Sequence, residues 1–434
     1  MTALFFLFAM IAGWSAYNLY RPINDHPNLC VVSFLVGWLT GELALHHIAW
    51  QVLLVFLFIW SGALEGFLAA LGFLIFAASW LAMGYFYLTG ERAAWTVKQA
   101  LQTTFGDDYQ EKINPELRTR LAKGPDWGLI KLPFTSVSRR VEVIKDIEFG
   151  DHGQALDIYR PRRHLAKSPV LFQIHGGAWT RNMGSKNEQA LPLMAHMAER
   201  DWICVSTDYR LCPQATFPEH MIDCKQALTW IKEHIVDYGG DPGFIVVTGG
   251  SAGGHLCALL ALTPNDPVFQ PGFEDIDTTV QGAVPFYGVY DLTDSNHHQR
   301  HNAQLKLFES SLMKLQRDSH LEEYEKASPL FRVNADAPPF FIIHGDMDSL
   351  VPVEEARDFA ATLKGTSNQP VVYAEVEGAQ HAFDMFASVR SEHVKNGVEH
   401  FLAFLYSTRG RKRTRRKSPA KKTTKKKSGP KSES

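Results

Sequence analysis

Thr248-Gly249-Gly250-Ser251-Ala252-Gly253-Gly254 lies between an apolar run, Phe244 to Val247, and a helical pattern, His255 to Leu262. A strand, a tight turn and a helix in this order place Ser251 at the tip of the turn. The flanking glycines leave the space that a serine in strained backbone geometry needs. The helix then points its unpaired amide groups toward whatever the serine attacks. The pattern predicts a nucleophile elbow, and the alternative interpretation is an ordinary linker turn.

From residue 141 onward, short apolar runs alternate with helical patterns. The further runs expected to be strands are Val141 to Ile147, Gln154 to Tyr159, Pro169 to Ile174, Trp202 to Thr207, Val280 to Tyr287, Phe340 to His344 and Val371 to Val376. Continuous apolar strands that alternate with helices indicate a largely parallel sheet covered on both faces, which is an α/β fold. Active sites on such sheets lie at the carboxyl ends of the strands.

A serine hydroxyl is a weak nucleophile and needs a base, which is usually histidine. His381 follows a predicted strand in a loop, where its side chain can reach Ser251, whereas the later histidines lie on a helical run. The alternative is a surface-loop histidine. A carboxylate must then orient the imidazole. Asp348 lies further into the loop after the preceding strand than Asp346 does, so Asp348 is predicted to be the acid and Asp346 a loop-capping residue.

Acyl transfer also needs hydrogen-bond donors for the developing oxyanion. A glycine-containing loop, His175 to Trp179, follows the predicted strand that ends at residue 174. Because glycine lets the backbone approach a substrate closely, the predicted donors are the amides of Gly176, Gly177 and Ala252. Trp179 is predicted to contact the substrate, and a buried aromatic residue without a ligand is the alternative.

Five motifs occur in register within residues 141–405: His175 to Trp179, Asp208 to Pro213 with Phe217-Pro218, Gly249 to Gly254, His344 to Asp348, and His381 to Phe383. This set resembles the hormone-sensitive-lipase-like and BD-FAE-like α/β-hydrolase esterases. The resemblance implies an α/β-hydrolase fold and hydrolysis of carboxylic esters without a cofactor, with Ser251 as nucleophile, Asp348 as acid and His381 as base. The oxyanion loop is closer to the His-Gly-Gly-x-Trp esterases, which include membrane-associated prenylcysteine methylesterases. A serine peptidase, an acyltransferase and a non-catalytic membrane scaffold remain alternatives.

The amino-terminal region is strongly apolar. Its apolar runs cover residues 3–20, 29–60 and 66–88. Runs of this length predict a helical membrane domain of about three spans within residues 1–90, so a multi-pass membrane protein is expected. Residues 91–140 are then a linker or a lid. Glu42 interrupts the second run and is either an intramembrane functional residue or a carboxylate at a span end or paired with a neighbouring helix.

Basic residues flank the predicted spans. Arg21 follows the first span, and Arg92 and Lys98 follow the last. Since basic flanks favour the cytoplasmic side, the hydrolase domain, residues 141–408, is predicted to face the cytoplasm. An anchored domain is suited to a lipid ester, although a small-molecule ester is equally compatible with the site.

The chain ends in a basic segment. Residues 409–434 hold thirteen Lys or Arg and one Glu, a local charge of +12, whereas the whole chain carries −2. A segment with so few apolar residues is predicted to be disordered. It is compatible with binding of anionic lipid or nucleic acid, or with a solvated tail without a partner. The five cysteines show no close pair, and the histidines show no metal-ligand spacing, so neither disulfides nor a metal are expected.

Overall fold

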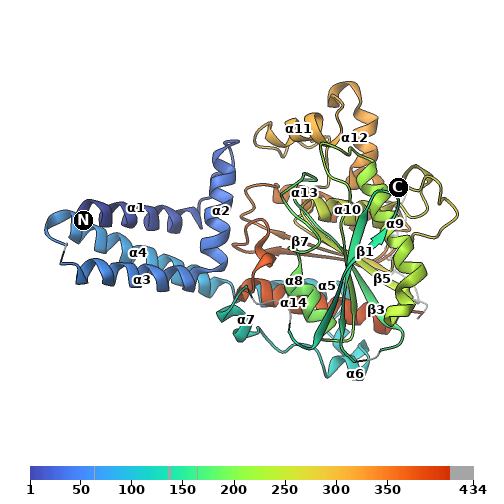
Figure 1. The fold of residues 1–434 in the computed structure, drawn as a ribbon, viewed down its shortest axis with the longest axis horizontal. Helices are drawn as coiled ribbons and strands as arrows, with labels where there is room; N and C mark the ends of the chain where they lie inside the picture. Colours follow the sequence, from blue (N-terminus) through green and yellow to red (C-terminus); the bar gives the residue numbers. More distant parts are fainter. Residues whose placement is uncertain (63, 135–137, 164, 411–434) are drawn as a thin grey trace, which may run out of the picture.

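An eight-stranded sheet forms the centre of the molecule in the computed structural model, which describes residues 1–62, 64–134, 138–163 and 165–410 (Figure 1). The strand order is β1-β2-β4-β3-β5-β6-β7-β8. The first two strands pair antiparallel, β2 pairs antiparallel with β4, and the other neighbours are parallel. The strands are β1 Val141–Phe149, β2 Gln154–Pro161, β3 Ser168–Ile174, β4 Ile203–Thr207, β5 Gly240–Gly250, β6 Gly282–Phe286, β7 Phe340–Gly345 and β8 Val371–Val376. The sheet is thus largely parallel, as predicted.

Helices cover both faces of this sheet. One apolar core joins it to α9 Glu219–His234, α10 Ala252–Leu262 and α13 Val353–Thr366. A second core on the other face involves α5 Arg92–Phe105, α8 Leu191–Ala198 and α14 Val389–Thr408. Every residue of the central strand β3 is buried, which explains why most of its side chains are apolar.

The amino-terminal helices form a separate layer. They are α1 Thr2–Asn18, α2 Leu29–Glu42, α3 Ala44–Trp60 and α4 Gly66–Thr89. Helices α1, α3 and α4 lie side by side and project from the sheet, and α2 crosses between them and the sheet (Figure 1). The amino terminus lies at the end of the bundle that is remote from the sheet (Figure 1).

Length and composition single out one helix that could span a membrane. It covers Gly66–Phe105, because α4 continues into α5, and 40 residues are more than a bilayer requires. Helices α2 and α3 meet the same criterion only as a pair, and they are bent by 90°. Helix α1 is apolar but has 17 residues. Within the described residues, these criteria therefore give one or two spans instead of the three predicted.

The apolar run from residue 29 to residue 60 is broken in the structure. Helix α2 ends at Glu42, and its side chain is buried 3.0 Å from the guanidinium of Arg390 at the start of α14. Glu42 also accepts a hydrogen bond from Ser388. The carboxylate is paired with a neighbouring helix, which was one of the interpretations of this residue. This contact fixes the end of α2 on the hydrolase layer, and the chain turns there.

Two connecting segments complete the fold. Residues 91–140 contain α5, which packs against α14, followed by the short helices α6 Pro115–Arg118 and α7 Trp127–Lys131. After β6 come α11 Ala303–Leu307, a π-helical turn over Phe308–Leu312, and α12 Leu321–Ala327. The basic tail from residue 411 onward lies outside the described residues.

Candidate active site

Ser251 occupies the turn between β5 and α10 in a backbone conformation that is rare for a residue with a side chain, φ 58° and ψ −122°. The neighbouring glycines make this turn sterically feasible. A Cβ on Gly249 would lie 2.4 Å from the carbonyl oxygen of Gly253, and a Cβ on Gly253 would lie 2.1 Å from that of Ile174. The local sequence therefore folds as a nucleophile elbow because only glycine fits at these two positions.

Three side chains from separate strand ends meet at this elbow. His381 Nε2 lies 2.8 Å from Ser251 Oγ, and His381 Nδ1 lies 2.6 Å from Asp348 Oδ2. Ser251 follows β5, Asp348 follows β7 and His381 follows β8. The structure thus brings together the three residues that were predicted as nucleophile, acid and base. Their spacing allows the imidazole to take the serine proton while the carboxylate holds the ring.

The carboxylate of Asp348 is buried and densely hydrogen bonded. Its Oδ1 accepts the backbone N–H groups of Leu350 and Val351, both at 2.8 Å, and Oδ2 also lies 3.2 Å from His344 Nε2. Burial acts to raise the pKa of Asp348, but the charge of nearby His381 and the bond from His344 outweigh burial and lower the pKa. The acid is therefore ionised when it faces the imidazole.

The neighbouring Asp346 serves the loop and not the imidazole. Its Oδ1 accepts the N–H of Gly378 at 2.7 Å, which links the acid loop to the loop that carries His381. Burial raises the pKa of Asp346. This is the capping role that the sequence predicted for it.

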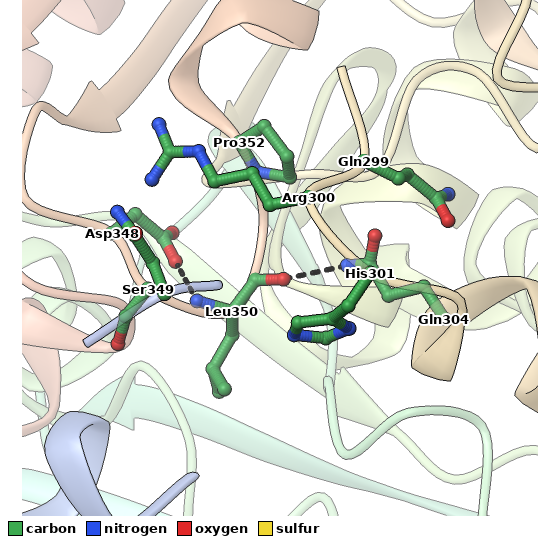
Figure 2. A pocket seen from close by; sticks show the side chains of 9 residues that line it. Gln299, Arg300, His301, Gln304, Asp348, Ser349, Leu350 and Pro352 are labelled. Carbon is green, nitrogen blue, oxygen red and sulfur yellow. Dashed lines mark hydrogen bonds between the residues drawn. The ribbon is translucent and has the colours of Figure 1, made fainter. Parts of the chain in front are cut away.

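A small pocket lies behind the acid loop, and three distant parts of the chain line it (Figure 2). Figure 2 shows Gln304 of α11 pointing toward Leu350, and its Nε2 donates to the Leu350 carbonyl oxygen at 2.7 Å. Asn24, from the loop before α2, lines the same pocket. The segment after β6 therefore supports the loop of the acid.

The oxyanion loop differs from its prediction at one position. The N–H of Gly176 donates to the side-chain oxygen of Gln189 at 2.5 Å, so this amide is not available to a substrate. Gly177 has a φ of 107°, and a Cβ there would lie 2.7 Å from the backbone of Met183. Ala252 is the first residue of α10, where an amide has no partner within the helix. The amide of Gly176 therefore does not act as a free donor, whereas Gly177 and Ala252 stay predictions.

Trp179 is packed inside the protein. Its side chain is 2% exposed, and its ring contacts His255 and Phe308 edge to face at 5.2 and 6.0 Å. The structure favours the alternative interpretation, a buried aromatic residue, over a substrate contact. His175 is also buried, and its ring stacks on Tyr209 at 4.4 Å.

Three residues beside the triad were not predicted from the sequence. Tyr287, after β6, donates its hydroxyl to Asp384, and its ring lies 4.7 Å from that of His381. Burial raises the pKa of Asp384 to about 6. On the other side, Phe34 of α2 lies 5.9 Å from the His381 ring. Asp384 carried a signal, because it lies three residues after the histidine, but nothing in the sequence linked Phe34 to residue 381.

No cluster of three or more metal-ligating side chains occurs in the described ranges. The groups that the site brings together are a serine, a histidine and a carboxylate. A mostly parallel sheet with this elbow defines the class of α/β-hydrolases that act through a serine.

Comparisons with known proteins agree with this class. The BD-FAE family model matches residues 156–363. The chain is 44% identical to the probable carboxylic ester hydrolase LipM of Mycobacterium tuberculosis, over 92% of this chain and 93% of that protein, and 38% identical to the esterase LipQ of the same organism, over 88% and 86%. Among solved structures, the butyrate-bound esterase 2 of Thermogutta terrifontis matches with a TM-score of 0.51 and 26% identity, over 62% of this chain and 94% of that one.

The chain belongs to the hormone-sensitive-lipase-like and BD-FAE-like family of α/β-hydrolase esterases, as the resemblance of its motifs implied. It is a carboxylic ester hydrolase with the α/β-hydrolase fold.

Proposed function

We propose that this chain is a membrane-anchored serine esterase that cleaves carboxylic esters through an acyl-enzyme intermediate. The observation that carries the proposal is the continuous contact from Ser251 through His381 to Asp348, with 2.8 and 2.6 Å separating the reacting and orienting atoms. His381 takes the proton of Ser251, and the serine oxygen attacks the ester carbonyl. The alcohol leaves with the proton from His381. A water molecule, activated by the same imidazole, then releases the acid and restores the serine.

The oxyanion is held by backbone donors in this proposal. The donors in this proposal are the amides of Gly177 and Ala178, in the loop after β3, and of Ala252, the first residue of α10. Such donors act most strongly on the transition state, because the negative charge develops there. Gly176 stabilises the loop through Gln189 instead.

The two relatives favour ester hydrolysis over the peptidase and acyltransferase alternatives, because their printed activities are those of an esterase and a carboxylic ester hydrolase. A non-catalytic scaffold would have no need for a strained serine in contact with a histidine. Strain of this kind persists only where the surrounding structure enforces it.

The amino-terminal bundle supports the membrane part of the proposal. Large apolar side chains on its helices face outward, such as Leu53, Phe56, Phe67, Leu74 and Leu81, which are 59–78% exposed. Soluble proteins rarely expose apolar patches of this extent. We propose that this bundle anchors the chain within a membrane domain of residues 1–90, with α4 as the helix that is long enough to cross the bilayer. Residues 91–140 link it to the hydrolase domain, residues 141–408.

The experiment that tests the catalytic assignment replaces Ser251 with alanine in the full-length protein purified in detergent. The wild type should be labelled by a fluorophosphonate probe and should hydrolyse p-nitrophenyl butyrate. Ser251→Ala should lose labelling and reduce kcat by roughly 10⁴-fold or more, with an unchanged melting temperature. Persistent labelling or turnover in Ser251→Ala would place the nucleophile elsewhere.

A further inference from the structure

Helix α2 contacts both the loop that carries the acid and the loop that carries the base. The indole N–H of Trp38 donates to the carbonyl oxygen of Ala382, the residue after the base, at 2.9 Å. The carbonyl oxygen of Cys30 accepts from Ser349, the residue after the acid, at 3.5 Å. These contacts span the helix from its first turn to its third. A helix from the amino-terminal region therefore forms one wall of the active site.

The buried ion pair between Glu42 and Arg390 holds the carboxyl end of α2 on the hydrolase domain. Arg390 also donates to the carbonyl oxygen of Glu377, which begins the loop of the base, at 2.9 Å. Breaking a buried ion pair is strongly unfavourable, because one charge is left without a partner. Helix α2 is thus held in a fixed position relative to His381.

The residues of α2 divide into two faces. Phe34 and Trp38 face the hydrolase domain, where their rings stack on each other at 5.6 Å and Trp38 stacks on Phe386 at 4.7 Å. The opposite face consists of Leu29, Val32, Leu35 and Leu39, which are 36–46% exposed. A helix that lies crosswise to an apolar bundle and exposes an apolar face has the placement of an interfacial helix, at the boundary between bilayer and water. The aromatic face and the lipid-facing side therefore belong to the same helix.

We infer that α2 delivers a lipid-soluble ester from the bilayer to Ser251 and that Phe34 determines the preference for its apolar chain. The inference rests on the proposed function and specifies its substrate class: a carboxylic ester with a long apolar chain on the acyl side. Phe34 lies at the edge of the His381 ring, 5.9 Å away, and is half-buried, so one part of its ring contacts the protein and another part stays accessible. In this inference the acyl chain bound at the serine packs against the accessible part of the Phe34 ring, on the side of α2 that faces the hydrolase domain.

The test compares kcat/KM for p-nitrophenyl octanoate and p-nitrophenyl acetate, with the full-length protein in detergent. The Phe34→Ala variant should lower the octanoate-to-acetate ratio about tenfold, because it removes the apolar surface beside the chain. Phe34→Leu keeps part of that surface and should lower the ratio about threefold. Val32→Ala is the matched control on the opposite face and should leave the ratio unchanged.

Rates are normalised to the fraction of protein that a fluorophosphonate labels. A loss of active protein is thereby separated from a change in chain-length preference. If Phe34→Ala is not recovered as labelled protein, the ratio of Phe34→Leu decides. An unchanged or increased ratio in the Phe34 variants, or an equal loss in Val32→Ala, would overturn the role of Phe34. Failure of the wild type to be labelled or to cleave either ester would instead refute the proposed function.

Discussion

At the scale of single residues, two aspartates in one loop have opposite roles. Asp348 accepts the Nδ1 side of His381, whereas Asp346 accepts a backbone N–H from Gly378. Asparagine at position 348 would present either the wrong hydrogen-bond partner or the wrong imidazole tautomer. We expect Asp348→Asn to lower kcat on the order of 10⁴-fold, with little change in KM.

Asp346→Asn provides the comparison for this prediction. The amide oxygen of asparagine still accepts the N–H of Gly378, so kcat should fall only by about threefold or less. Steady-state kinetics on p-nitrophenyl butyrate separate the two variants. Similar losses in both variants would show that the acid lies elsewhere.

The amide of Gly176 shows, at the same scale, which contacts the sequence does not predict. Gly176 was predicted as an oxyanion donor because the glycine-containing loop follows a strand. The donor is engaged instead by Gln189, 13 residues later, and that contact depends on how the intervening loop folds. The residues of the elbow were predicted well because their requirement for space is local. A hydrogen bond between two loops carries no such local pattern.

Buried Lys225 of α9 gives a prediction on pH. Its ammonium group is surrounded by neutral oxygens of Thr263, Gln270 and Thr278, and burial lowers its pKa to about 8. An unfolded chain has a lysine pKa of about 10.4. Between these two values the unfolded chain binds more protons, so the free energy of unfolding contributed by Lys225 rises with pH.

We therefore expect the wild type to gain stability between about pH 8 and pH 10 relative to Lys225→Met, which lacks the titrating group. Thermal unfolding in one detergent across this range measures the difference. Lys145→Met, at an exposed position of β1, should follow the wild type. A Lys225→Met variant with the same pH dependence as the wild type would contradict the assignment.

At the scale of elements, the strands were predicted within a few residues, because their signal is a run of neighbouring apolar side chains. The break between α2 and α3 was not predicted as the end of a helix on the hydrolase domain. Its cause is the pair of Glu42 with Arg390, which are 348 positions apart in the chain. Such a contact exists only after the sheet has folded and placed α14 beside the bundle.

The contact between α5 and α14 gives a prediction on stability. A Cβ on Gly397 of α14 would lie 1.9 Å from Val97 Cγ1 of α5, so the two helices are in direct backbone-to-side-chain contact. Gly397→Ala should lower the free energy of unfolding by about 1–3 kcal/mol, because the added methyl group forces the helices apart. Since the contact is remote from Ser251, kcat at low temperature should be retained.

Gly365→Ala of α13 is the matched control, because nothing lies within 4 Å of its Cβ position. There, alanine should raise the free energy of unfolding by up to about 1 kcal/mol through its higher helix propensity. Thermal unfolding with parallel activity assays measures both variants. Equal free energies of unfolding for Gly397→Ala and Gly365→Ala would show that the contact between α5 and α14 accommodates an added methyl group.

At the scale of the whole molecule, the basic tail begins far from the bundle. Helix α14 starts at the Glu42 contact, and its 20 residues extend over about 30 Å. At its other end, Tyr406 packs on Phe244, which lies on the amino side of the elbow strand. The described part of the chain therefore ends beside the amino-terminal half of β5, away from the end of this strand that carries Ser251.

The orientation across the membrane is the prediction that belongs to the complete chain. Helix α1 runs from the remote end of the bundle toward the sheet (Figure 1), and Arg21 follows its end by three residues, whereas Arg92 forms an ion pair with Glu377 of the hydrolase domain. The basic flanks and the hydrolase domain are thus on one side, and basic flanks favour the cytoplasm. Protease added to intact cells should leave the hydrolase domain undigested, and the same protease should cleave it after lysis. A periplasmic or extracellular reporter protein provides the control for access of the protease. Digestion of the hydrolase domain in cells that remain sealed would contradict the cytoplasmic orientation. That result would not affect the contacts of α2 with the active site.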